Sequence, residues 1–133
     1  MTQPSAPTTV WIVDDDLGFV WWLGDLFNET GCRVLPALAC DQAVSLIKTL
    51  NVGIDLLVLN PQLPGVIRML QMLRGADANF KVVAIGKTPP VLAAAIHPQA
   101  NLERPSSSDS ISRLEWLTKV RKLLKVVAAA ATV

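Results

Sequence analysis

The feature that most constrains this chain is an apolar run that ends at one polar residue. The run covers residues 56–59, and Asn60 ends it. A turn follows, marked by Pro61, Pro64 and Gly65. A short apolar run bounded by such turn residues predicts a buried strand. Because ligands of open parallel sheets bind at the carboxyl ends of the strands, Asn60 stands where a functional residue is expected.

Short apolar runs alternate along the chain with segments whose apolar residues recur at helical spacing. The expected strands are 10–13, 32–35, 56–59, 81–85 and 100–102, and the expected helices are 17–30, 41–50, 66–74, 91–96 and a last helix that ends near 127. This alternation predicts an α/β domain whose parallel sheet is covered on both faces. Right-handed crossovers limit the topology to a doubly wound three-layer sandwich, a (βα)5 domain.

Residues at the helix ends support these boundaries. Asp16 is expected to cap the first helix, and Gly31 is expected to follow its last turn. Asp109 or Ser110 is expected to cap the last helix. An inward stripe is predicted on that helix, made of Ile111, Leu114, Leu117, Val120, Leu124 and Val127. We expect one domain over 10–127, a flexible leader over 1–9 and a frayed tail over 128–133.

Charge and hydropathy exclude several classes of function. Lys and Arg number 12 against 11 for Asp and Glu, so no global field draws the chain to nucleic acid or to an anionic membrane. The basic run from Lys119 to Lys125 is interpreted as a solvated face. No apolar run approaches the roughly 20 residues of a membrane span, and 1–9 lacks a signal-peptide pattern. A cytoplasmic location is therefore expected.

Two residue types that often carry chemistry are given structural roles. Cys32 and Cys40 show no metal or redox spacing, so they are predicted to be small buried hydrophobic residues. His97, the only histidine, has no acid or cysteine beside it in the sequence and is assigned no chemistry.

Three short motifs together point to a known family. An acidic segment, 13–16, ends the first strand with Asp14, Asp15 and Asp16, and the segment 56–65 reads Leu-Leu-Val-Leu-Asn-Pro-Gln-Leu-Pro-Gly. These motifs resemble the strand-one acids and the strand-three Leu-Asp-x-x-Leu-Pro-Gly signature of bacterial response regulator receiver domains. Arg104-Pro105 stands at that family's Lys-Pro position. The resemblance covers about 10–127 and implies a flavodoxin-like fold with strand order 2-1-3-4-5.

In receivers the strand-three aspartate takes a phosphoryl group from a histidine kinase. The resemblance implies that Asp14 and Asp15 match the acids that hold Mg²⁺, and that the Gln62 carbonyl matches the backbone ligand. Asn60 stands at the nucleophile position, where a neutral amide is a poorer nucleophile and a weaker ligand for a hard cation than a carboxylate. We therefore expect phosphorylation there to fail, any Mg²⁺ binding to be weak, and no other cofactor.

The resemblance also places three residues at positions that transmit the signal in receivers. Gly86 stands where a Thr or Ser hydroxyl follows the phosphoryl group, and Asn101 stands where an aromatic side chain rotates. Arg104 replaces the lysine and keeps its charge, but its planar fork does not reproduce a compact ammonium. Arg104 is expected to be able to pair with Asp14 or Asp15 instead.

Two surfaces are predicted as interfaces. Val20 and Trp21 are expected on the face of the first helix opposite Phe19 and Trp22, where Gly24 would admit another backbone. Coverage of this face by the leader is the alternative. Trp116 and Leu123, beside the inward stripe of the last helix, are candidates for a second interface, and half-burial against the sheet is their alternative.

These expectations describe a degenerate receiver, a non-enzymatic interaction module that works without phosphorylation. Its partner would be a protein, namely a histidine kinase, another receiver or an output protein, with a homodimer as a further option. Two alternatives stay open: phosphoryl acceptance at Asp14 or Asp15, and small-ligand binding in the same crevice.

Overall fold

A computed structural model of the chain describes residues 7–50, 52–76, 79–96, 98, 100–103 and 110–131. His97, Arg104 and Asp109 lie outside these ranges. The strands are β1 (Thr9–Val13), β2 (Arg33–Ala37), β3 (Leu56–Leu59), β4 (Lys81–Ile85) and β5 (Ala100–Leu102). The helices are α1 (Leu17–Glu29), α2 (Cys40–Thr49), α3 (Val66–Ala76), α4 (Pro90–Ile96) and α5 (Ser110–Ala131).

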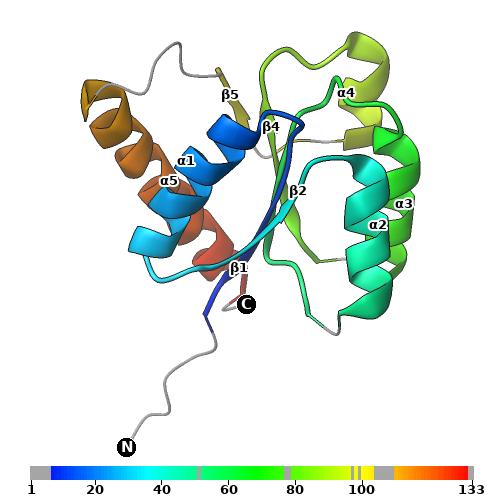
Figure 1. The fold of residues 1–133 in the computed structure, drawn as a ribbon, viewed down its shortest axis with the longest axis horizontal. Coiled ribbons are helices and arrows are strands. Elements are labelled where there is room, and N and C mark those ends of the chain that lie inside the picture. Colours follow the sequence, from blue (N-terminus) through cyan, green and yellow to red (C-terminus); the bar gives the residue numbers. More distant parts are fainter. Residues whose placement is uncertain are drawn as a thin grey trace, which may run out of the picture.

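The five strands form one parallel sheet in the order β2-β1-β3-β4-β5. Figure 1 shows α1 and α5 on one face of this sheet and α2, α3 and α4 on the other. The predicted fold class, layers and strand order are confirmed. Crossover helices on both faces explain why the central strands are continuous apolar runs.

Side chains of each strand divide between two apolar cores. In β1, Val10 and Ile12 face the α1 and α5 layer, and Trp11 and Val13 face the α2 and α3 layer. All four are fully buried. This division follows from the two-residue period of a strand. The central strands β1 and β3 are buried on both faces, whereas the edge strands β2 and β5 are partly exposed.

The observed boundaries differ from the predicted ones by two or more residues at the ends of three elements. β2 runs to Ala37 and includes Pro36, which an edge strand tolerates because one side of its backbone needs no ladder partner. α3 continues past Arg74 to Ala76. α5 continues to Ala131, so the helix includes four residues of the expected frayed tail. Those four residues are alanines, which have the highest helix propensity.

The predicted stripe of α5 is wrong at Leu114, which is 66% exposed. Trp116 is buried instead, with its ring edge-on to Phe19 at 6.0 Å and to Trp22 at 5.6 Å between centroids. A large aromatic side chain buries more apolar area than a leucine, so its burial sets the rotation of the helix. Trp116 is therefore not an exposed interface residue, and Leu123 is half-buried against the same core.

Both predicted ends of α1 are confirmed. The Asp16 carboxylate accepts a hydrogen bond from the Phe19 backbone N–H at 3.1 Å, which is the N-cap geometry. Gly31 follows the last turn with φ of +87°, and its N–H donates to the Asn28 carbonyl. Within the described residues, none of the helices combines the length and the apolar character that crossing a bilayer requires.

Both cysteines are buried, as predicted, and both are free thiols. Burial raises the pKa of the Cys32 thiol, and nearby Asp55 adds to the increase, while a hydrogen bond with Thr30 opposes it. Burial also raises the pKa of Cys40, with a further contribution from Asp41. Both thiols are therefore protonated and unreactive near neutral pH.

Candidate functional site

The carboxyl ends of β1 and β3 bring Asp14 and Asn60 to the same edge of the sheet. Val13 and Leu59 are register partners in the two strands, and the Asn60 N–H donates to the Val13 carbonyl at 3.0 Å. Each polar residue directly follows one of these paired residues. Asp14 and Asn60 therefore both lie at the carboxyl edge of the sheet.

The three consecutive acids after β1 have separate environments. Asp14 is buried, and its Oδ1 accepts a hydrogen bond from the Asp16 N–H at 2.9 Å. Asp15 is exposed. Asp16 uses its carboxylate to cap α1. The segment therefore contains one buried and one exposed carboxylate, and the third carboxylate caps α1.

Asn60 shapes the loop that follows it. Its Oδ1 accepts a hydrogen bond from the Gln62 backbone N–H at 3.0 Å, and its backbone carbonyl accepts one from Leu63 at 3.3 Å. This is an Asx turn, in which a short polar side chain bonds to the backbone two residues on. The side-chain oxygen of Asn60 is thus used inside its own turn.

Further hydrogen bonds tie the loops at this edge together. Gln62 Nε2 donates to the Lys87 carbonyl at 3.3 Å, which joins the loop after β3 to the loop after β4. Thr88 Oγ1 donates to Asn101 Oδ1 at 3.1 Å, which joins the loop after β4 to β5. Thr88 was not predicted from the sequence, and its only signal is its place three residues after the end of β4.

Gly86 and Asn101, the two predicted switch positions in the described chain, both contribute to this link. Gly86 has φ of +87°, and its N–H donates to the Leu102 carbonyl at 2.7 Å. A positive φ favours glycine because a Cβ would be strained there. The loop after β4 therefore begins in a conformation that a Thr or Ser would adopt only with strain.

The donors present at this edge fit Mg²⁺ poorly. Mg²⁺ prefers a near-octahedral set of hard oxygens, supplied in part by carboxylates. Asp14 and Asp15 are the carboxylates that the acidic segment brings to this edge, and Asn60 adds only an amide. Across the described residues no cluster of three or more His, Cys, Asp or Glu is placed to hold a metal ion. Pairing of Arg104 with these acids stays a prediction, since Arg104 lies outside the described residues.

The outer face of α1 differs in part from its prediction. Trp21 is 73% exposed, but Val20 is buried in the core between α1 and the sheet. Gly24 is also buried, and a Cβ on it would lie 3.5 Å from Cγ1 of Val34. Gly24 therefore packs against side chains of this chain's own β2 and β1, and it is not open to the backbone of a partner. Of the two residues proposed for this surface, Trp21 alone is accessible.

A hollow of about 510 Å³ lies beside Trp21, between α1 and β2, and we call it the α1–β2 groove. Its lining includes Leu17, Trp21, Gly24, Val34, Pro36 and Leu38. In Figure 1, β2 runs between α1 and α2. The strand order alone does not predict this groove, because the hollow depends on how the side chains of α1 and β2 pack against each other.

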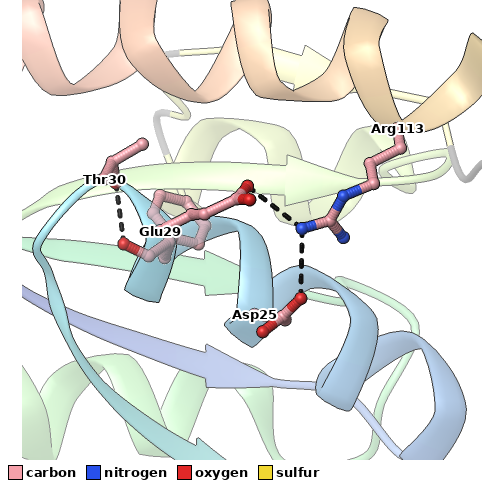
Figure 2. A network of polar contacts seen from close by, with 5 residues as sticks. Asp25, Glu29, Thr30 and Arg113 are labelled. Carbon is pink, nitrogen blue, oxygen red and sulfur yellow. Dashed lines mark hydrogen bonds and ion pairs between the residues drawn. The ribbon is translucent and has the colours of Figure 1, made fainter. Parts of the chain in front are cut away.

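An ion-pair network joins α1 to α5. Figure 2 shows Arg113 reaching both Asp25, at 3.1 Å, and Glu29, at 3.0 Å. The same view shows the Thr30 hydroxyl near the end of α1, where it donates to the Phe27 carbonyl at 2.7 Å. These carboxylates are largely exposed, so the pairs fix the approach of the helices more than they add stability.

No protein-family model matches the sequence, and no curated protein matches it either. Several solved structures share its fold. A signal receiver domain of an HD domain-containing protein from Pseudomonas fluorescens Pf-5 has a TM-score of 0.74 at 14% identity and covers 99% of this chain and 97% of its own. A CheY-like response regulator receiver domain protein from Methanospirillum hungatei JF-1 has a TM-score of 0.72 at 17% identity, with coverages of 93% and 98%.

A response regulator receiver protein from Sinorhizobium medicae WSM419 is also similar, with a TM-score of 0.67 at 20% identity over 91% of this chain and 97% of its own. At such identities the likeness establishes the fold. The chain therefore has the fold of response regulator receiver domains, over nearly its whole length, as the motifs implied.

Proposed function

We propose that this chain is a receiver-type module of two-component signalling that acts by protein contact and does not accept a phosphoryl group at its β3 edge. The observation that carries the proposal is Asn60 at the carboxyl end of β3, with its side-chain oxygen used as the acceptor of an Asx turn. In the receiver fold this is the position of the acceptor aspartate.

The chemistry of an amide supports this reading. Attack on phosphorus needs an electron-rich oxygen, and an amide oxygen is neutral, whereas a carboxylate oxygen is charged. Conversion of Asn60 to aspartate by deamidation needs the N–H of the next residue, and Pro61 has none. The replacement is therefore chemically stable, and the edge remains silent in the unmodified chain.

The hydrogen bonds between loops also support independence from phosphorylation. In receivers the loop after β4 moves toward a phosphoryl group, whereas here Gln62 and Asn101 already hold that loop from both sides. Gly86 offers no hydroxyl to follow such a group. The module would thus present one fixed surface to its partners.

The partner class follows from the same role. A protein partner fits it, namely a histidine kinase, another receiver, an output protein or a second copy of this chain, and neither nucleic acid nor a membrane is required. The module would act in the cytoplasm and would catalyse no reaction of its own.

Intact mass after incubation with Mg²⁺ and a small-molecule phosphodonor tests the proposal. The native chain, Asp14→Asn and Asp15→Asn are all expected to keep their masses. A native chain that gains a phosphoryl group would overturn the proposal. If the native chain gains a phosphoryl group and either Asp14→Asn or Asp15→Asn does not, the acceptor is the substituted residue after β1.

A further inference from the structure

The α1–β2 groove has an accessible apolar rim. Leu17 is 54% exposed and Trp21 is 73% exposed, and the two lie one helical turn apart on α1. Removal of apolar surface from water favours binding, and tryptophan is enriched among the residues that dominate binding energy at interfaces. A partner that covers Trp21 would therefore gain more binding free energy there than at an average surface position.

The residues at the base of the groove carry little side-chain bulk. Gly24 contributes no side chain, and Val34 and Pro36 of β2 form the opposite wall. An apolar side chain of a partner can thus reach the floor between helix and strand. The hollow is wide enough, at about 510 Å³, to take several such side chains.

The edge of β2 is closed to an added strand. Arg33 donates its N–H to Thr8, and Ala37 accepts from Asp14, so these two residues face β1, and Val34 and Pro36 face outward by alternation. Pro36 has no N–H to donate. The next outward N–H, that of Leu38, is already bonded to Gln42 Oε1 at 2.8 Å. Extended peptides would find too few backbone partners here.

The charged side chains that line the groove and the hollow next to it are carboxylates. The groove adjoins a second hollow beside α2, and both are lined by Pro36 and Gln42. The charged residues that line the two hollows are Asp25 and Asp41, and neither lining contains Lys or Arg. Asp25 pairs with Arg113, yet its side chain remains 68% exposed. A complementary partner would carry positive charge beside its apolar surface.

We propose that the α1–β2 groove binds an amphipathic helix of a partner protein, with an apolar stripe over Trp21 and with Lys or Arg on its flanks. This deepens the proposed interaction role by naming the partner's chemistry, and it rests on that role. A helix fits because its i, i+3, i+4, i+7 stripe fills a groove without needing free backbone groups on the receiving strand.

Selection from a display library of random peptides, each about 20 residues long, tests the inference. Peptides are selected on the native chain and counter-selected on Trp21→Glu. Enriched sequences are expected to show helical apolar spacing with Lys or Arg flanks. Their affinity should fall at least about tenfold on Trp21→Ala, the size of effect seen for interface hot spots. The matched control is Val91→Ala on α4, an 84% exposed apolar residue whose loss should leave the affinity unchanged.

Several results would overturn the inference. One such result is a selection that enriches no peptide. Another is a set of enriched sequences that alternate like a strand or lack Lys and Arg flanks. A third is binding that Trp21→Ala leaves unchanged. Self-association of the native chain that Trp21→Ala abolishes, measured by sedimentation, would assign the groove to a second copy and would also overturn it. Peptides that bind outside the groove would contradict the groove proposal but not the proposed interaction role. Phosphorylation of the native chain would contradict the proposed role itself. The two failures are therefore distinguishable.

Discussion

The Oδ1 of Asn60 accepts a hydrogen bond from the backbone N–H of Gln62 at 3.0 Å, immediately beyond the end of β3. An aspartate oxygen accepts the same bond, because Asn and Asp both form Asx turns. Asn60→Asp is therefore expected to keep the loop while it restores a carboxylate. This makes it the sharpest variant for separating the loop's shape from its chemistry.

Mg²⁺ should stabilise the native chain and the Asn60→Asp variant to different extents. A ligand present at a concentration equal to its Kd adds about 0.4 kcal/mol to the free energy of unfolding. For the native chain we expect a gain below about 0.4 kcal/mol at about 10 mM Mg²⁺, and a larger gain for Asn60→Asp, which supplies a further carboxylate. Thermal unfolding with and without Mg²⁺, at matched ionic strength, measures both. Equal gains in the two proteins would contradict the assignment of Asn60 as the missing ligand.

Gly86→Thr should destabilise the fold even though it restores a hydroxyl at the predicted switch position. The φ of +87° costs a non-glycine residue about 1–2 kcal/mol, although no atom blocks the Cβ itself. Urea unfolding measures the loss. Gly75→Ala is the matched control, because Gly75 lies in α3 with open space around it. This variant should raise the free energy of unfolding by up to about 1 kcal/mol. If Gly86→Thr leaves the free energy of unfolding unchanged, the backbone at this position relaxes readily and the strain argument is wrong.

Two tryptophans should differ sharply when they are truncated. Trp116→Ala empties a buried aromatic cluster with Phe19 and Trp22, so we expect a loss of about 3–5 kcal/mol in unfolding free energy. Trp21→Ala, at a 73% exposed position, should change it by no more than about 0.5 kcal/mol. Chemical denaturation of both variants provides the comparison. Similar losses would mean that α5 is not docked through Trp116.

The buried thiols should make stability fall in mildly alkaline solution. Their pKa values are raised by burial above the ordinary value of 9.0, so the folded state binds more protons than the unfolded state once pH passes that value. Their contribution is complete below pH 9.0 and is lost as pH rises toward the raised folded values.

Urea unfolding of the native chain and of the double variant Cys32→Ala, Cys40→Ala, at about pH 8 and pH 10, checks this dependence. The sequence contains no tyrosine, so no phenol titrates in the same range. The double variant should lose less stability on this step than the native chain does. An identical loss in both proteins would assign the pH dependence to other groups.

The parts of the fold that follow from local pattern were predictable. The predicted strands 81–85 and 100–102 coincide with β4 and β5, and Asp16 and Gly31 bound α1 as their cap chemistry requires. Features that depend on packing between elements were not. The helical spacing of α5 suits both Leu114 and Trp116, and only the position of Phe19 and Trp22 across the interface selects the tryptophan.

The candidate site shows the same division. That Asp14 and Asn60 meet follows from strand order, but the Asx turn of Asn60 and the link from Thr88 to Asn101 depend on loop conformation. Val20 was predicted on the outer face because the helical period alone leaves the helix free to rotate. Contact of α1 with β2 fixes that rotation and buries it.

The most direct test of the central claim is the intact mass of the native chain and of Asn60→Asp, side by side, after incubation with Mg²⁺ and a small-molecule phosphodonor. The account predicts that the native chain gains nothing. A gain by Asn60→Asp alone would show a receiver site silenced by one residue, and a gain by neither would show that Gly86 and the linked loops have removed the activity as well. A phosphoryl group on the native chain would contradict the account.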